Sequence, residues 1–199
     1  AGKSVDSLQG LKKLTSVGGN VQILFTSLTN LKGLEKLASV GGGLTIRANN
    51  SLSTTDGFSG LNIVGGYINI YSNDMLSNMD GFYHLSSVGD LYICFNNALI
   101  SIDGFYSLHR VGIIAITSNN ALTNIDGFIG ITSLQALYII SNNLLNDLSG
   151  LQNLSSIVHM LTVKNNPSLC KSNIKNLLNQ LSPQPIHVVQ HRNTGICTI

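Results

Sequence analysis

The chain has 199 residues, of which 43% are hydrophobic and 10% are charged, and its net charge is +2. This charge is too small to indicate binding to nucleic acid or to a membrane surface, and no apolar run approaches the ~20 residues of a membrane span. Charged residues fall well below the roughly 25% that is usual in globular proteins, so Asn, Ser and Thr supply most of the polarity.

One pattern recurs through the chain with a period of 23 or 24 residues. An apolar residue near the start of each strand-like segment is followed five residues later by a polar residue, which is Thr in the first unit and Asn in the rest. The apolar positions are Val21, Leu44, Ile68, Leu91, Ile114, Leu137 and Leu161, and the polar positions are Thr26, Asn49, Asn73, Asn96, Asn119, Asn142 and Asn166. Such a period predicts a solenoid, because a unit this short buries no core alone and must stack on its neighbours.

We therefore expect one elongated domain over residues 1–199, all-β apart from its cap. Its three predicted parts are an entry coil at 1–20, the repeats at 21–169 and a disulfide-closed cap at 170–199. Within a repeat, alternation such as Ile68-Asn69-Ile70 predicts a short strand with one buried face. Successive strands are expected to lie in parallel, ~4.8 Å apart.

Two recurring turns are expected in each repeat. Val-Gly-Gly at 17–19, 40–42 and 64–66 predicts corners where glycine adopts conformations closed to other residues. Asp-Gly at 56–57, 80–81, 103–104 and 126–127 predicts a second corner, and the following Phe residues should stack as a buried column. The Asn column should bond turn groups and its neighbours in adjacent repeats. For the carboxylates of Asp56, Asp80, Asp103 and Asp126 two interpretations stay open, bonds to turn N–H groups or a bound cation.

The end of the chain predicts a cap. Apolar residues at helical spacing in 171–181 predict a helix over the last repeat. Of the three cysteines, Cys170 and Cys197 lie beyond the last full repeat and are expected to pair, which leaves Cys94 as a free thiol. Asn49 and Asn153 begin N-glycosylation motifs.

The frame Leu-x-x-Leu-x-Ser-Val-Gly-Gly-x-Leu-x-Ile-x-x-Asn resembles the receptor L-domain family, the leucine-rich ectodomain modules of insulin-type and epidermal-growth-factor-type receptors. Residues 34–49 and 85–96 match this frame, and 166–170, Asn-Pro-Ser-Leu-Cys, resembles the family's closing motif before its capping helix. The resemblance covers about residues 8–197. It implies a right-handed parallel β-helix of about seven coils with a helical cap, which presents its main sheet to peptide ligands.

The outward positions of the predicted strands form the candidate binding face. This face carries Arg47, Tyr71, Tyr92, Tyr138 and Lys164, and tyrosine offers large contact area at low entropy cost. We expect it to bind an extracellular protein or carbohydrate, with no cofactor, no metal, no nucleic acid and no insertion into a membrane. The expected location is the cell surface or the extracellular space.

Two other functions stay open. Low charge and an N-terminal edge through which copies could self-associate are typical of a structural or adhesive component of a surface coat or filament. Ice binding needs regular ranks of Thr on a flat face, and the mixed outward residues here make it the least favoured of the three. No nucleophile, base and orienting group converge in the sequence, so we expect no enzymatic activity.

Overall fold

The computed structural model describes residues 5–195, which form a parallel ten-stranded sheet with an α-helix near its C-terminal end. The strands are β1 (Ser16–Val17), β2 (Val21–Leu24), β3 (Ser39–Val40), β4 (Leu44–Arg47), β5 (Ile63–Tyr71), β6 (Ser87–Cys94), β7 (Ile113–Thr117), β8 (Ser133–Ile140), β9 (Ser156–Lys164) and β10 (His187–His191). The helical elements are the 3-10 turns η1 (Gln9–Leu11), η2 (Asp56–Phe58), η3 (Asp80–Phe82), η4 (Asp103–Phe105), η5 (Asp126–Phe128) and η6 (Ser149–Leu151), and α1 (Lys171–Gln180).

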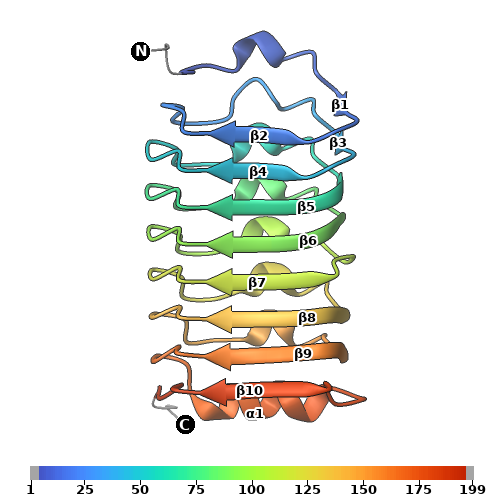
Figure 1. The fold of residues 1–199 in the computed structure, drawn as a ribbon, viewed down its shortest axis with the longest axis vertical. Coiled ribbons are helices and arrows are strands. Elements are labelled where there is room, and N and C mark those ends of the chain that lie inside the picture. The colour runs from blue at the N-terminus through green and yellow to red at the C-terminus, as the bar shows by residue number, and fades with distance from the viewer. Residues whose placement is uncertain (1–4, 196–199) are drawn as a thin grey trace.

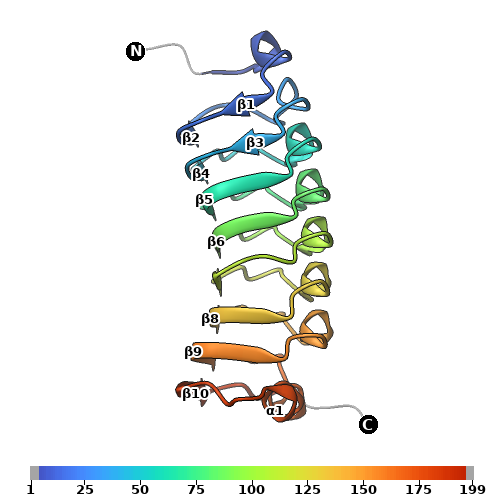
Figure 2. The same cartoon turned by 90° about the vertical axis from the view of Figure 1, so that its right-hand side faces the viewer.

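The strands stack in one direction along the long axis of the molecule (Figure 1). Figure 2, turned by 90° from Figure 1, shows the 3-10 turns stacked along one side of the molecule and the strands on the other. The register advances by one repeat per strand, as in Leu44 opposite Ile68 and Ile68 opposite Leu91. These residues are fully buried, whereas Arg47 at the end of β4 is exposed. The predicted strands, their parallel pairing and their inward positions are confirmed.

A column of phenylalanines fills the core behind the strands. Phe58, Phe82, Phe105 and Phe128 each end a 3-10 turn and are fully buried. Their ring centroids are 5.5, 5.2 and 6.0 Å apart along the column. Phe82 and Phe105 therefore pack on the rings of the repeats before and after them, and Phe58 and Phe128 end the column, as the sequence predicted.

A ladder of buried asparagine side chains joins the repeats at the opposite corner. In a typical rung, the backbone N–H and Nδ2 of Asn96 both donate to Oδ1 of Asn119, at 3.0 and 3.3 Å. Nδ2 of Asn96 also donates to the carbonyl of Ile70 in the preceding repeat and to that of Cys94 in its own. This arrangement confirms the structural role that we predicted for the column. The ladder begins at Thr26 and continues past Asn166 to Asn193, one rung further than the repeat spacing predicted.

The glycines serve close packing rather than special backbone angles, which corrects the prediction for the Val-Gly-Gly corners. Among the glycines of the described chain, only Gly33 has a positive φ. Gly65 and Gly66 lie within β5, at an irregularity in its pairing with β6. A Cβ atom on Gly41 would overlap the carbonyl oxygen of Gly18, and one on Gly81 would overlap that of Thr55. Glycine is required because successive repeats approach through their backbones.

The C-terminal helix covers the end of the core as predicted. Ile174, Leu177 and Leu181 are buried against the last repeat. Cys170 forms an isolated parallel bridge with Gly195. Its second cysteine, Cys197, lies outside the described residues, so the pair stays a prediction. No helix within residues 5–195 is both long and apolar enough to cross a membrane.

The asparagine ladder predicts that a buried and an outward substitution in the same repeat lower stability by different amounts. Asn119→Ala removes an acceptor of two bonds from Asn96 and a donor to Ile93, so buried polar groups lose their partners. The free energy of unfolding should fall by about 1–3 kcal/mol. The outward substitution Thr117→Ala, on the adjacent strand, should change it by less than about 0.5 kcal/mol. Urea denaturation of the two variants checks this order, and the reverse ranking would contradict the assigned ladder.

The phenylalanine column predicts a larger loss. Phe105→Ala opens a cavity between two neighbouring rings and should lower the free energy of unfolding by about 3–5 kcal/mol. Tyr106→Ala, at the exposed neighbouring position, is the control and should cost far less. Denaturant midpoints at constant m-value provide the measurement. A loss from Phe105→Ala no greater than that from Tyr106→Ala would exclude the stacked core.

Candidate functional site

Two rows of outward side chains cross strands β4 to β9, and we call them together the strand face. The register aligns Thr45, Asn69, Tyr92, Ala115, Tyr138 and Thr162 in one row, and Arg47, Tyr71, Cys94, Thr117, Ile140 and Lys164 in the other. All five residues singled out from the sequence therefore lie on this face. Arg47 and Tyr71 are direct neighbours, Tyr92 and Tyr138 lie two strands apart, and Lys164 lies at the far end in β9.

Arg47 is held between two aromatic rings. Its guanidinium carbon lies 4.7 Å from the ring centroid of Tyr71 and 5.3 Å from that of Phe25. A guanidinium stacks favourably on aromatic faces. The rings therefore fix the cation at one end of the strand face instead of leaving it as a free arm.

Two exposed phenylalanines border the strand face, and the sequence reasoning missed both. Phe25 and Phe95 are 67% and 50% exposed, at the corner directly after a strand. Both have positive φ, 53° and 57°, which is uncommon for bulky residues. The repeat held a signal for them, since Ala48, Ser72 and Ser118 occupy the same place in other units. Phe25 and Phe95 thus place large apolar rings where these other units have small residues.

Tyr92 is anchored rather than free. Its hydroxyl lies 3.4 Å from Oδ2 of Asp90, and Oδ1 of Asp90 accepts the backbone N–H of Ile113 at 2.9 Å. Partial burial, and then the charge and hydrogen bond of Asp90, raise the pKa of Tyr92 above its ordinary value, with a smaller contribution from Tyr138. The phenol therefore stays protonated at neutral pH and presents a fixed ring to solvent.

Cys94 lies between Tyr71 and Thr117 in the second row and is a free cysteine. Burial raises the pKa of its thiol, and hydrogen bonds with Thr117 only partly offset this. A protonated, half-buried thiol is a poor nucleophile. Among residues 5–195 no three His, Cys, Asp or Glu side chains come together as metal ligands.

The structure separates the two glycosylation candidates. Asn49 is fully buried, and its Nδ2 donates to the carbonyl of Ile23 and to Oδ1 of Asn73. A glycan on that nitrogen is incompatible with the ladder, so the Asn49 prediction is wrong. The motif is local, whereas the burial comes from stacking of repeats. Asn153 is exposed and remains a candidate, although its Nδ2 donates to the carbonyl of Ile129.

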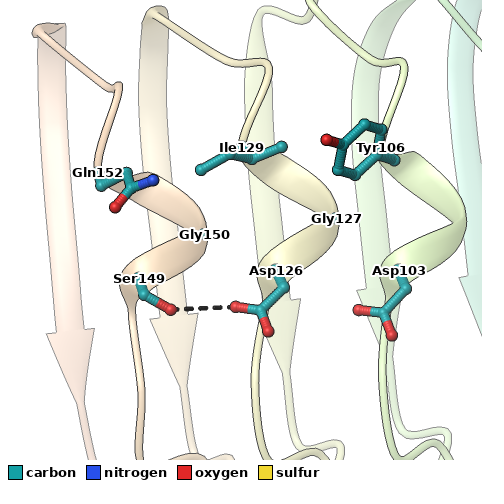
Figure 3. A pocket seen from close by; sticks show the side chains of 8 residues that line it. All are labelled: Asp103, Tyr106, Asp126, Gly127, Ile129, Ser149, Gly150 and Gln152. Atoms are coloured by element: carbon teal, nitrogen blue, oxygen red, sulfur yellow. Dashed lines mark hydrogen bonds between the residues drawn. The ribbon is translucent and has the colours of Figure 1, made fainter.

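A second surface lies on the opposite side of the stack, along η3, η4 and η5, and we call it the turn groove. One side carries Asp80, Asp103 and Asp126, and the other carries Tyr83, Tyr106 and Ile129. Figure 3 shows the two rows running parallel, with backbone at Gly127 and Gly150 between them. The groove consists of shallow pockets of about 530 and 480 Å³ that share Asp103 and Tyr106.

Within residues 5–195 the carboxylates of this groove accept no bond from a turn N–H group, so the first of the two interpretations given for them is wrong. The turn N–H groups of Asp56, Asp80 and Asp126 donate instead to the side chain two residues earlier, as Asp80 does to Asn78. Among the described residues the carboxylates of Asp56, Asp80 and Asp103 have no hydrogen-bond partner, and only that of Asp126 accepts a bond, from Ser149 at 3.1 Å. The polar side chain two residues before each of these Asp residues accepts the turn N–H group, and the Asp carboxylate does not.

Mutual repulsion among these carboxylates predicts that removing the charge of one of them stabilises the fold in a pH-dependent way. Burial, and then the charges of Asp56 and Asp103, raise the pKa of Asp80 above 3.8 in the folded state. The folded chain then binds this proton more tightly than the unfolded chain, so ionisation of Asp80 opposes folding above the folded pKa. Asp80→Asn should raise the melting temperature at pH 7, and the gain should vanish below pH 3.8, where both states are protonated.

Thermal melts of the wild type and Asp80→Asn between pH 3 and 7 measure this difference. Added salt should reduce the gain at pH 7, because the repulsion is close to solvent. Asp74→Asn, which removes an exposed carboxylate in the turn after β5, is the matched control and should give no such gain. A pH-independent difference for Asp80→Asn would show that repulsion is not its cause.

Comparisons of the chain with protein families, with curated proteins and with solved structures found no match.

Proposed function

We propose that this chain is a recognition module that binds a protein or glycan partner outside the cell, in secreted form or at the cell surface, through the strand face. We further propose that it is a right-handed parallel β-helix of about seven coils and a distant member of the receptor L-domain family. The ten-stranded parallel sheet, the C-terminal helix and the motifs that resemble that family support this proposal.

The arrangement of aromatic side chains on the strand face carries the proposal. In-register pairing gathers Tyr71, Tyr92 and Tyr138 on one continuous surface, and Phe25 and Phe95 border it. Aromatic residues dominate the binding energy of protein interfaces. Several of these are fixed before a partner arrives, by stacking on Arg47 or by bonding to Asp90. Such pre-organisation reduces the entropy lost on binding.

Binding fits this face better than catalysis. Its cysteine is half-buried, and burial raises the pKa of the thiol, which keeps it in the poorly nucleophilic protonated form at neutral pH. Its two predicted cations lie at opposite ends, in β4 and β9, so they do not form the basic patch that a nucleic acid would need. The exposed sequon at Asn153 agrees with an extracellular location.

The two ends of the stack favour a second function, as a structural or adhesive component. Strands β1 and β10 are the ends of the strand order, and β2 pairs only with β4, so both ends have an edge without a partner strand within residues 5–195. All residues of β10 are exposed. Open parallel edges at both ends would allow copies to associate head to tail into a filament.

Replacing three tyrosines distinguishes the two functions. The Tyr71→Ser, Tyr92→Ser, Tyr138→Ser triple variant should fold, because these side chains point outward from the core. We expect it to bind partners found on arrays of glycans and of secreted or cell-surface proteins at least tenfold more weakly than the wild type, or about 1.4 kcal/mol. Surface plasmon resonance with each array ligand gives the dissociation constants.

The matched control is the double variant Tyr83→Ser, Tyr106→Ser, which removes exposed tyrosines from the opposite side of the stack. It should keep full affinity for ligands of the strand face. If the folded triple variant binds ligands of the strand face as tightly as the wild type does, the recognition proposal is wrong. Light scattering that shows concentration-dependent filaments of both the wild type and the triple variant would instead support the structural function.

A further inference from the structure

The turn groove lies on the side of the stack that the proposed function does not use. We propose that it binds a basic, arginine-bearing peptide segment of a partner protein, with the guanidinium groups set between its carboxylate row and its tyrosines. This inference is independent of the strand face, since the two surfaces lie on opposite sides (Figure 2).

The carboxylate row supplies the charge complement. Asp80 and Asp103 are exposed and have no hydrogen-bond or ion-pair partner among residues 5–195. Burial, and then the neighbouring charges of Asp56 and Asp103, raise the pKa of Asp80, as expected where like charges are held close together. A cationic side chain laid along the row would relieve this repulsion and gain from each carboxylate. Neutral ligands such as sugars would leave it in place, so the charges favour a cation.

The aromatic row favours arginine over lysine. Tyr83 and Tyr106 are 54% and 58% exposed, with ring planes within 7° of parallel and centroids 6.4 Å apart. Figure 3 shows the ring of Tyr106 beside the pocket, across from Asp103 and Asp126. A planar guanidinium can stack on such a ring while its N–H groups reach a carboxylate in a forked arrangement. An ammonium group offers neither contact as well.

The molecule already contains one guanidinium stacked on aromatic rings. Arg47 contacts the rings of Phe25 and Tyr71, which come from the repeats before and after its own. A ring one repeat away from an arginine therefore accepts its guanidinium in this fold. In the turn groove Tyr83 and Tyr106 lie one repeat apart and stack on each other, so a bound guanidinium would contact their free surfaces, across from the carboxylates.

The length of the carboxylate row sets the size of the segment. Asp56 of η2 extends the row one repeat beyond the turn groove, so Asp56 and Asp126 lie three strand spacings of ~4.8 Å, or about 14 Å, apart. In an extended peptide, side chains four residues apart are separated by about 13 Å. A five-residue segment with arginines at its first, third and fifth positions thus spans the row. The shared residues Asp103 and Tyr106 at the centre should dominate its binding.

Isothermal titration calorimetry with synthetic peptides tests the proposal on the whole chain. The probe is acetyl-Arg-Ala-Arg-Ala-Arg-amide, compared with the matching lysine peptide and with maltohexaose. We expect the arginine peptide to bind most tightly, with an affinity that falls as salt is raised. Asp103→Asn and Tyr106→Leu should each weaken it at least fivefold. Asp74→Asn carries the same change in charge outside the groove and should leave the affinity unchanged.

Four results would overturn the proposal. These are no measurable binding of the arginine peptide at low salt, full affinity of folded Asp103→Asn, equal losses in Asp103→Asn and Asp74→Asn, or tighter binding of maltohexaose than of the peptide. Circular dichroism confirms that each variant is folded. If Tyr106→Leu is destabilised, Tyr83→Leu tests the same ring surface and should also weaken the peptide at least fivefold.

Discussion

The asparagine ladder is the constraint on which the rest of the structure depends. At each repeat the chain turns through a residue with positive φ, directly before the buried Asn, and this turn leaves backbone carbonyls inside the molecule. Burying such groups without partners costs several kcal/mol. From Asn73 to Asn166, Nδ2 of each ladder Asn donates to a carbonyl of its own repeat and to one of the preceding repeat, while its Oδ1 accepts from the preceding Asn. Every rung thereby fixes its repeat to its neighbour in a single register, from which the rows of both outer surfaces follow.

Positions that repeat and face inward were predictable from the sequence, because a stacked column allows little variation. The Asn and Phe columns, the parallel strands and α1 follow from spacing and residue type alone. The pairing of Asn166 with Asn193 was not predictable, since α1 lengthens the step to 27 residues. The burial of Asn49 was missed because the glycosylation motif reports only three neighbouring residues. The unpartnered carboxylates were missed because Asn78 and its equivalents compete for the same turn N–H groups, which only coordinates resolve.

The two outer surfaces differ in chemistry although the same stacking produces both. Stacking turns one position of the repeat into a row of side chains at strand spacing. On the strand face the rows mix aromatic, small and cationic residues, and Arg47 and Tyr92 are fixed by neighbours within the surface. Along the 3-10 turns Asp recurs unchanged through four repeats and gives way to Ser149 in η6, where Ser149 donates to Asp126. The first surface is varied in sequence, whereas the second is uniform in charge.

Thr26 has a consequence for how such a chain can lengthen. Its backbone N–H and hydroxyl both donate to Oδ1 of Asn49, so it completes the first rung without needing a rung before it. At the other end, α1 and Asn193 complete the last one. Between these two ends every rung bonds only to its neighbours. In genetic terms, an in-frame duplication or deletion of one 23- or 24-residue unit would preserve the ladder bonds at the new junction, so the number of repeats can change during evolution while both ends are retained.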